Sequence, residues 1–506
     1  MALEFYNHIK LHAEKIPDHP AIIDGDTTLT YSKLLEQIEK FSGALTKLNL
    51  GPNSKLGIFC LNQKEYIIAF IGSLLKGLPV VPFNFLLGPE DLGFIAKNAE
   101  IDTLIVDSMF IKKETLPFFQ MFRNKIVVGE TDLGAMGAGT TSFEKFLLNG
   151  DRKEVPHTRD ASIPDTIFYT SGTTGRPKGV MLDEKQFDIN CDGFLAHLDI
   201  SGKDRAIVAL PLFHSFGNIL SLALLRQGAT LIFLRQFAPK TILDMATKYK
   251  ATLLPLVPTI YSFLIQIYAR GGYDVSSLRA CISGGASLPD ALHNKVKEIL
   301  GTAVLEGYGL TETSPVIAVN KSSEGGVPGS VGPVLPNLKI KIIDDSGQPV
   351  KQGDVGEIWV RGETVMRGYW KNPQETEKIM TSDRWLKTGD LGHLDEKNRL
   401  YISAGRKKDL IIRAGENVAP LAIENALMNH PALMEAAVIG IPDDRLGEKV
   451  KACIVLREGA TADEQELKNF CRERLPAFMV PDMIEFHDSF PKNATGKVLK
   501  NQLRES

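Results

Sequence analysis

The sequence lacks the features that mark several large classes of protein. Its 506 residues carry 58 lysines and arginines against 61 aspartates and glutamates, so no basic excess marks it as a nucleic-acid-binding protein. The five cysteines are scattered, and none belongs to a CxxC pair. This spacing argues against a disulfide framework and against a zinc site, and it is typical of a protein in a reducing compartment.

Long apolar runs are also scarce. The one candidate for a membrane span, AIVALPLFHSFGNILSLALL at residues 206–225, is interrupted by Pro211, His214 and Asn218. A buried strand that leads into a buried helix explains this run better. The first twenty residues carry charges throughout and show no signal-peptide core. We therefore expect a cytoplasmic protein with at most peripheral membrane contact.

Apolar, β-branched runs alternate with amphipathic helical patterns through the first four hundred residues. Residues 31–45, for example, place their apolar side chains at helical spacing after Thr30, which is a good N-cap residue. The runs KLGIFC and PVVPFN enclose another helical pattern. This alternation predicts an α/β domain of layered sheets and helices with much parallel sheet. From about residue 326, short strands broken by Gly and Pro predict a small β-rich subdomain.

The last hundred residues have a different pattern. After a basic segment at 405–420, the order helix, strand, strand, helix, strand is predicted for residues 421–429, 434–440, 449–456, 462–474 and 483–487. Thr461 and Glu464 have the spacing of a capping box for the second of these helices. We expect two domains, a large N-terminal one at 1–404 and a mobile α+β one at 405–506.

The segment YTSGTTGRPKGV, residues 169–180, combines glycines, hydroxyl groups and one lysine. Glycines leave backbone N–H groups open to an anion, the hydroxyls donate further hydrogen bonds, and Lys178 adds a positive charge. No Gly-Lys-Ser/Thr triplet follows a glycine at the Walker spacing. The segment therefore predicts phosphate binding in nucleotide chemistry of another kind.

Other segments give weaker signals when each is taken alone. In EGYGLTETSP, residues 306–315, an aromatic ring between two glycines can lie against a base, and Glu312 is a suitable Mg²⁺ ligand. Asp390 in KTGD could accept hydrogen bonds from ribose hydroxyls, but taken alone it is better explained as an ordinary turn residue. Lys497, in a glycine-flanked loop, is by itself better explained as an ordinary surface lysine.

Taken together and in this order, the segments resemble the adenylate-forming enzyme superfamily of acyl-CoA synthetases, firefly-type luciferases and nonribosomal-peptide adenylation domains. YTSGTTGRPKGV resembles its phosphate loop, PLFHSFG its acyl-site segment, and ISGGASL with EGYGLTETSP its adenine site. KTGD resembles the ribose-binding turn, GRKKDLI the hinge, and PKNATGK the loop of the terminal lysine. The resemblance covers nearly the whole chain and is particularly strong to bacterial fatty-acid CoA ligases.

This resemblance implies a reaction and a set of site residues. An acid attacks the α-phosphate of ATP to give an acyl-adenylate and pyrophosphate, and the thiol of CoA then displaces AMP. The residues implied to bind ATP are Thr170, Ser171, Gly172, Thr173, Thr174, Gly175 and Lys178 at the phosphates, Gly284, Gly285, Ala286, Glu306, Gly307 and Tyr308 at the adenine, Thr311 at the α-phosphate, and Asp390 and Arg406 at the ribose. The residues implied in catalysis are Lys497, Thr311, Glu312 and His214, with Glu312 also the Mg²⁺ ligand.

The segments that resemble the acyl pocket are residues 213–218, 256–262, 282–286 and 311–316. They contain no Lys, Arg or Asp, which favours a hydrophobic monocarboxylate, namely a medium- or long-chain fatty acid, over an amino acid or a dicarboxylate. An aryl acid is the alternative substrate, and the phosphopantetheine arm of a carrier protein is the alternative acceptor.

Three functions outside this reaction are alternatives: binding of a nucleotide or fatty acid by a fold that has lost catalysis, phosphoryl transfer with release of ADP, and luciferase-like oxidation. The presence of Lys178, Glu312 and Lys497 argues against the loss of catalysis. One departure from the superfamily concerns the acceptor step, because Ala414 stands where many members have a glycine. Its methyl group is expected to narrow the path of the thiol.

Overall fold

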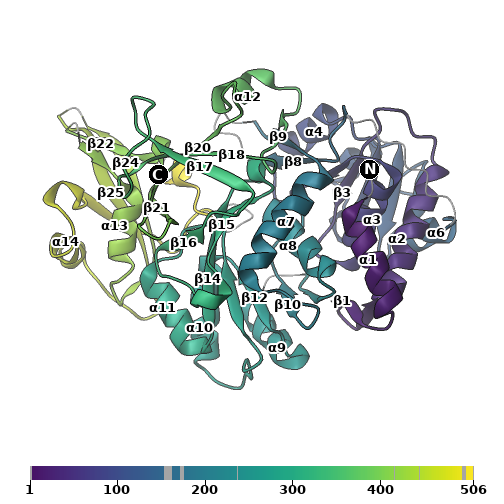
Figure 1. Ribbon diagram of the computed structural model, residues 1–506, viewed down its shortest axis with the longest axis horizontal. Helices are drawn as coiled ribbons and strands as arrows, with labels where there is room; N and C mark the ends of the chain where they lie inside the picture. The colour runs from purple at the N-terminus through teal and green to yellow at the C-terminus, as the bar shows by residue number, and fades with distance from the viewer. Residues whose placement is uncertain are drawn as a thin grey trace.

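The computed structural model describes residues 3–152, 162–170, 176–235, 238–414, 416–443, 445–492 and 497–504. Within these ranges, two eight-stranded sheets and one five-stranded sheet lie in the N-terminal part, and a further five-stranded sheet lies in the C-terminal part (Figure 1). The α/β class expected from the sequence is confirmed.

The first eight-stranded sheet holds the strands on either side of the predicted phosphate loop. It is parallel through its middle and ends in antiparallel pairs at β8, β9 and β19. In sheet order its strands are β19 (Gly368–Tyr369), β9 (Lys178–Leu182), β8 (Thr166–Thr170), β4 (Val80–Pro82), β3 (Leu56–Phe59), β5 (Thr103–Asp107), β6 (Asn124–Val128) and β7 (Thr140–Ser142).

The second eight-stranded sheet carries the predicted adenine and acyl segments at the ends of its strands. Its inner strands are parallel, and its two edge pairs, β14 with β15 and β1 with β2, are antiparallel. In sheet order its strands are β15 (Val316–Val319), β14 (Ala303–Gly309), β13 (Ala280–Ser283), β12 (Leu253–Leu256), β10 (Arg205–Val208), β11 (Thr230–Phe233), β1 (Pro20–Asp24) and β2 (Thr27–Thr30).

Helices fill the space between these two sheets and form the main core with them. One hydrophobic cluster includes residues of both sheets and of helices α1, α2, α3, α7 and α8, which lie side by side in Figure 1. The expected strand followed by a buried helix at 206–225 is confirmed as β10 and α8. The helices of the N-terminal part are α1 (Glu4–Lys15), α2 (Tyr31–Thr46), α3 (Lys64–Lys76), α4 (Pro89–Asn98), α5 (Leu116–Gln120), α6 (Phe143–Leu148), α7 (Glu184–Leu198), α8 (Ser215–Arg226), α9 (Pro239–Tyr249), α10 (Pro258–Tyr268), α11 (Asp290–Leu300) and α12 (Pro373–Ile379).

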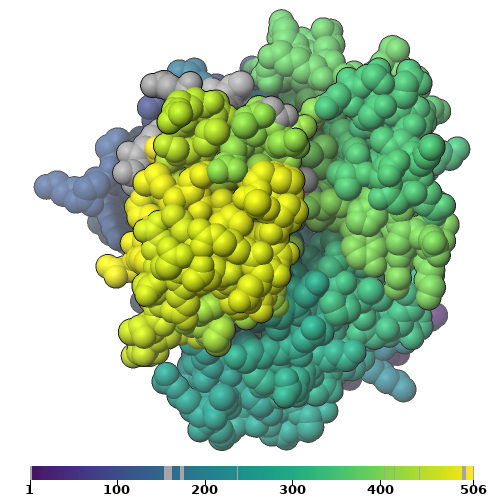
Figure 2. All heavy atoms as spheres, turned by 90° about the vertical axis from the view of Figure 1, so that its left-hand side faces the viewer, coloured from purple at the N-terminus to yellow at the C-terminus, as the bar shows by residue number. Residues whose placement is uncertain are grey.

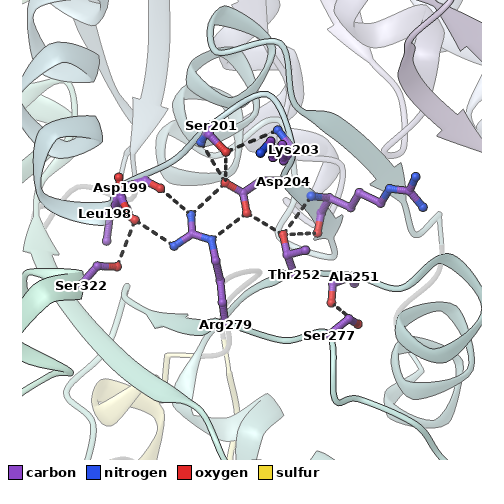
Figure 3. A network of polar contacts seen from close by, with 11 residues as sticks. Leu198, Asp199, Ser201, Lys203, Asp204, Ala251, Thr252, Ser277, Arg279 and Ser322 are labelled. Carbon is purple, nitrogen blue, oxygen red and sulfur yellow. Dashed lines mark hydrogen bonds and ion pairs between the residues drawn. The ribbon is translucent and has the colours of Figure 1, made fainter.

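An ion pair with a buried carboxylate, between Arg279 and Asp204, ties the end of α7 to the second sheet (Figure 3). The guanidinium of Arg279 donates two hydrogen bonds to the Asp204 carboxylate, at 2.7 and 2.8 Å, and further ones to the carbonyls of Leu198 and Asp199. Thr252 donates to the same carboxylate at 2.7 Å. The pair therefore joins the last carbonyls of α7, which have no partner inside the helix, to the starts of β10, β12 and β13.

The predicted β-rich subdomain is confirmed as the antiparallel five-stranded sheet. In sheet order its strands are β16 (Ser330–Pro333), β21 (Arg399–Arg406), β20 (Leu386–Leu394), β18 (Gly356–Gly362) and β17 (Leu338–Ile343). Asp390 of β20 stands opposite Arg406 of β21, the last residue of that strand. Strand β21 therefore runs two residues past the domain boundary expected between 404 and 405.

The C-terminal residues form a lobe with its own hydrophobic clusters, coloured yellow-green to yellow in Figure 2. The five predicted elements are present, and a short hairpin and a last helix were not predicted. The elements are β22 (Ile411–Arg413), β23 (Glu416–Val418), α13 (Pro420–Leu427), β24 (Leu433–Asp443), β25 (Gly447–Leu456), α14 (Glu464–Arg472), β26 (Met483–Phe486) and α15 (Lys500–Arg504). Single turns of 3₁₀-helix connect elements at η1 (Ser108–Phe110), η2 (Thr311–Thr313), η3 (Ser322–Glu324), η4 (Lys407–Asp409) and η5 (Ala477–Met479).

Two predicted helix caps had different outcomes. The Thr30 side chain accepts a hydrogen bond from the Lys33 amide, as expected for the N-cap of α2. The capping box at Thr461 and Glu464 is wrong, because Asp463 is the N-cap of α14 and accepts from the Glu466 amide at 2.8 Å. An aspartate directly before the first helical turn offers a charged acceptor at the right place, so the helix begins two residues later than a Thr461 cap requires.

In the described part of the chain, no helix combines the length and the apolar character needed to cross a membrane.

Candidate active site

Asp390 is the centre of a polar cluster between β14 and the β20–β21 hairpin. Its side chain accepts a 2.6 Å hydrogen bond from the Tyr308 hydroxyl and lies 3.2 Å from the Arg406 guanidinium. Asp390 is only 6% exposed, so both interactions take place away from bulk water. Burial, followed by the charge of Asp390, raises the pKa of Tyr308, which keeps its hydroxyl protonated as a donor. Three residues predicted to bind the nucleotide, namely Tyr308, Asp390 and Arg406, therefore lie together.

Lys497 lies close to this cluster, although about ninety residues separate it from Arg406 in the sequence. Burial lowers the pKa of the Lys497 ammonium, and the positive charge of Arg406 lowers it further. The carboxylates of Asp390 and Asp409 act in the opposite direction. The C-terminal lobe thus brings its predicted catalytic lysine to the predicted ribose residues.

Glu312 lies in η2, the single turn that follows the strand of the Gly-flanked Tyr308. Its carboxylate accepts a 2.8 Å hydrogen bond from the Tyr369 hydroxyl, and its carbonyl accepts from the Met366 amide at 2.8 Å. Burial, followed by the charge of Glu312, raises the pKa of Tyr369 and keeps that hydroxyl protonated. Glu312 is therefore held at both its backbone and its side chain.

Lys178 begins β9 at the end of the predicted phosphate loop, opposite Thr170 of β8. Its ammonium forms an ion pair with Glu375 of α12 and lies 5.3 Å from the centre of the Tyr369 ring. Tyr369 therefore touches both Lys178 and Glu312 and connects the two predicted phosphate-binding groups. The remaining predicted loop residues, Ser171, Gly172, Thr173, Thr174 and Gly175, lie outside the described residues.

The predicted adenine residues directly follow β13, at 284–286, and lie in β14, at 306–308. Gly285 has φ +81°, a left-handed conformation that glycine adopts without strain, and Ala286 beside it is half-buried. Gly307 pairs with Val319 across β14 and β15. Burial raises the pKa of Glu306 to about 8, and one of its oxygens accepts from the Leu288 amide at 2.9 Å.

The predicted acyl segments also come together. The hydroxyls of Ser215 and Thr311 are 3.0 Å apart. A Cβ atom at Gly284 would lie 3.0 Å from the Phe216 ring, so the glycine allows that ring to approach. Burial lowers the pKa of His214 to about 4, which makes the imidazole neutral at physiological pH. His214 also caps α8, where it accepts from the Phe216 amide at 3.4 Å.

Sequence reasoning missed two residues of this arrangement and assigned no individual role to a third. Tyr369 and Glu375, which it missed, contact Glu312 and Lys178. Ser215 of the predicted acyl segment contacts Thr311. The segment RGYW at 367–370, with an aromatic residue after a glycine, resembles the EGYG segment in composition and could have drawn attention to Tyr369. Nothing in the sequence around Glu375 distinguishes it from other helical glutamates.

Comparisons with known proteins match both parts of the chain. The profile of the AMP-binding enzyme family matches residues 9–370, and that of the AMP-binding enzyme C-terminal domain matches residues 422–497. A long-chain-fatty-acid–CoA ligase of Bacillus subtilis (strain 168) is 33% identical over 97% of this chain and 92% of its own. A feruloyl-CoA synthase of Amycolatopsis is 31% identical over 97% of this chain and 96% of its own.

Among solved structures, ATP-bound MatB from Rhodopseudomonas palustris superimposes with a TM-score of 0.88. It is 30% identical and covers 100% of this chain and 99% of its own. Fold, site and relatives together define an enzyme that joins an acid to a thiol. The chain belongs to the AMP-binding enzyme family, as one of its adenylate-forming acyl-CoA ligases.

Proposed function

We propose that the enzyme activates a medium- or long-chain fatty acid with ATP and transfers the acyl group to CoA. The single observation that carries this proposal is that Lys497 lies within electrostatic range of Asp390 and Arg406, and Arg406 in turn within electrostatic range of Glu312. A carboxylate that attacks the α-phosphate brings two anions together, so catalysis depends on positioning and on neutralising charge. Lys497 would lie between the acid and the α-phosphate, and Asp390 and Arg406 would hold the ribose.

Lys178, with Thr170 and the glycine-rich segment 171–175, would hold the β- and γ-phosphates. In the structure Glu375 is the ionic partner of Lys178, so an arriving phosphate would exchange one anion for another on the same ammonium. Tyr369 would keep Lys178 and Glu312 at a fixed separation, because it contacts both.

The carboxylate of Glu312 suits Mg²⁺, which takes one or two carboxylates together with phosphate oxygens and water. No group of three His, Cys, Asp or Glu side chains that could hold a metal is found within the described ranges. The donors at Glu312 therefore fit an ion that arrives with the nucleotide. When bound, Mg²⁺ supplies positive charge next to the phosphates.

A hydrophobic acid is supported by the buried apolar side chains of the predicted acyl segments. Phe213 is 6% exposed and Val257 is 4% exposed, and the Phe216 ring packs over Gly284. His214, neutral because of its burial, adds no charge to this region. The feruloyl-CoA synthase relative favours an aryl acid as the second candidate substrate.

The domain arrangement is part of the same proposal. Residues 405–506 would act as a mobile domain that places Lys497 at the ATP site for the first step and withdraws it for the second. Such domain gating is common where one site performs two successive steps.

The experiment that tests the proposed function measures pyrophosphate release from ATP and Mg²⁺ with a panel of acids, with and without CoA. The panel contains acetate, octanoate, palmitate, oleate, benzoate, cinnamate and ferulate. We expect CoA-dependent turnover with an optimum among the longer fatty acids and AMP as the nucleotide product. An optimum at cinnamate or ferulate would replace the fatty acid by an aryl acid. ADP as product would contradict adenylation, and release of a single equivalent despite CoA would point to another acceptor.

A further inference from the structure

Contacts between Pro491–Lys492 and Val498–Leu499 join the two ends of the segment that carries Lys497. Lys492 and Val498 form an antiparallel β-bridge, and the Leu499 amide donates a 2.8 Å hydrogen bond to the Pro491 carbonyl. Lys497 is the residue directly before the second end of this bridge. Its position therefore depends on how the two ends are attached to the rest of the C-terminal lobe.

The first end is attached to β24 by an ion pair. The Lys492 ammonium lies 2.8 and 2.6 Å from the two carboxylate oxygens of Glu435. The two side chains are only 22% and 15% exposed, so water and salt screen their attraction less than they screen a surface pair.

The second end is attached to α13 and β24 by another ion pair. The Lys500 ammonium, at the start of α15, lies 2.6 Å from one oxygen of Glu424, and these side chains are also 22% and 15% exposed. The same oxygen accepts a 2.8 Å hydrogen bond from the Val438 amide of β24. Glu424 is thus fixed by a strand of the lobe and in turn fixes Lys500, three residues after Lys497.

Apolar contacts also hold this segment against the lobe, but they define the exact position of its residues less strictly than the ion pairs do. Phe490 and Leu503 belong to a hydrophobic cluster with Ala437, Ile439 and Cys453, and Val498 packs against this cluster. Apolar contacts are non-directional, whereas an ion pair with short hydrogen bonds fixes one geometry. In the sequence, one lysine–glutamate pair precedes Lys497 and the other follows it. Both pairs attach the segment of Lys497 to the C-terminal lobe.

We propose that Glu424 and Glu435 are positioning residues for Lys497. They act through Lys500 and Lys492 at the two ends of its segment, and this inference rests on the proposed role of Lys497 in adenylate formation. A displacement of about 1 Å at a reacting group can cost on the order of 100-fold in rate. Loosening one of two attachments should therefore lower adenylation while the lobe stays folded.

The test compares Glu424→Gln and Glu435→Gln with the matched control Glu485→Gln. Glu485 pairs with Lys451, which is 7% exposed, between β25 and β26 of the same lobe. Among the described residues it contacts neither Lys492 nor Lys500, and it reaches Phe490 only through His487. For each variant we would measure kcat and KM for ATP in adenylation, and the rate of thioester formation from supplied acyl-adenylate and CoA. We expect kcat for adenylation to fall about 10-fold in the first two variants. KM for ATP, thioester formation and all rates of the control should stay near wild type.

A charge exchange distinguishes positioning from general damage. Glu435→Lys combined with Lys492→Glu reverses the first pair, and it should recover most of the adenylation rate that Glu435→Lys alone loses. Equal losses in both half-reactions, losses of the same size in the Glu485→Gln control, or unchanged adenylation in both glutamine variants would each overturn the inference.

A readout without turnover separates this inference from the proposed function. The rate at which an amine-reactive acetylating reagent modifies Lys497, followed by peptide mass mapping, should rise in Glu424→Gln and Glu435→Gln but not in Glu485→Gln. If wild type activates no acid of the panel while this rise is seen, the proposed function fails and the attachment of Lys497 stands. If wild type turns over and the rise is missing, the attachment fails and the function stands.

Discussion

At the scale of single residues, Lys497 is held in an environment that disfavours its charge. Burial and Arg406 both lower its pKa. Substitution Lys497→Ala is expected to reduce pyrophosphate release by at least roughly 10²–10³-fold, the loss typical of one preorganised donor. The dissociation constant of ATP, measured by calorimetry, should change little, because the other nucleotide residues remain. Pyrophosphate release close to the wild-type rate would contradict the role of Lys497.

Ala414 is a second residue in an unusual conformation. It follows β22 in the β22–β23 hairpin with φ +50°, and its amide donates a 2.7 Å hydrogen bond to the Leu446 carbonyl. A left-handed conformation costs a residue with a Cβ roughly 1 kcal/mol, part of which the greater freedom of glycine in the unfolded chain offsets. Ala414→Gly should therefore stabilise the hairpin by about 0.5 kcal/mol and slow its amide hydrogen exchange about twofold.

The same variant tests the expectation that the Ala414 methyl group narrows the path of the thiol. Thioester formation from supplied acyl-adenylate should then become faster, while adenylation is unchanged. Faster hydrogen exchange in the hairpin would contradict the first expectation, and an unchanged thioester rate would contradict the second.

At the scale of secondary-structure elements, the Arg279–Asp204 pair connects four of them (Figure 3). Burial opposes the charge of Asp204, but hydrogen bonds from Arg279 and Thr252 outweigh it and lower the pKa of this carboxyl. Asp204→Asn is expected to lower the free energy of unfolding by about 2 kcal/mol at neutral pH, since hydrogen bonds to a charged group are lost. Urea unfolding, followed by tryptophan fluorescence, measures the free energy of unfolding of both proteins.

The pH dependence of the same variant has a definite sign. A carboxyl with a lowered pKa in the folded state contributes stability above its unfolded pKa of about 4, and this contribution is lost as the pH falls through the folded value. The difference between wild type and Asp204→Asn should therefore be largest near pH 7 and shrink below pH 4. A difference that stays constant down to pH 2 would show that packing, not charge, causes the loss.

The sequence predicted most elements because their signals are local. The helical spacing after Thr30 and the β-branched runs of the parallel strands need no knowledge of distant residues. The cap of α14 was misplaced because Thr461 and Asp463 are both good N-cap residues and the pattern alone does not rank them. The roles of Tyr369 and Glu375 were missed for another reason. Their contacts with Glu312 and Lys178 join residues 57 and 197 positions apart, which only the folded chain brings together.

Some of the proposed site residues could be found from local sequence motifs, and others could not. Lys497, Asp390 and Arg406 were selected through a resemblance of motifs, and the structure places them near one another. The contacts of Lys178 with Glu375 and of Tyr308 with Asp390 were outside the reach of motif reasoning, because neither partner pair lies within one segment.

At the scale of the whole molecule, the short segment between β21 and β22 joins the C-terminal lobe to the N-terminal part of the chain. Lys408 lies in η4 within this segment and belongs to GRKKDLI, the stretch that resembles the hinge of the superfamily. Proline fixes φ near −65°, so Lys408→Pro removes one of the rotations that a domain movement needs. Adenylation should persist within about threefold of wild type, whereas thioester formation from supplied acyl-adenylate should fall more than about 10-fold. Equal loss of both half-reactions would contradict a hinge at Lys408.

All five cysteines are buried, and burial raises the pKa of each thiol, to about 12 at Cys281 and about 11 at Cys453 and Cys471. Thiol reagents react with the thiolate, so the native protein should be almost inert to maleimides. One exposed cysteine placed on α14 and one on α9 would then accept a pair of fluorophores without removal of any natural thiol. Energy transfer between the two dyes would follow the C-terminal lobe in single molecules during turnover.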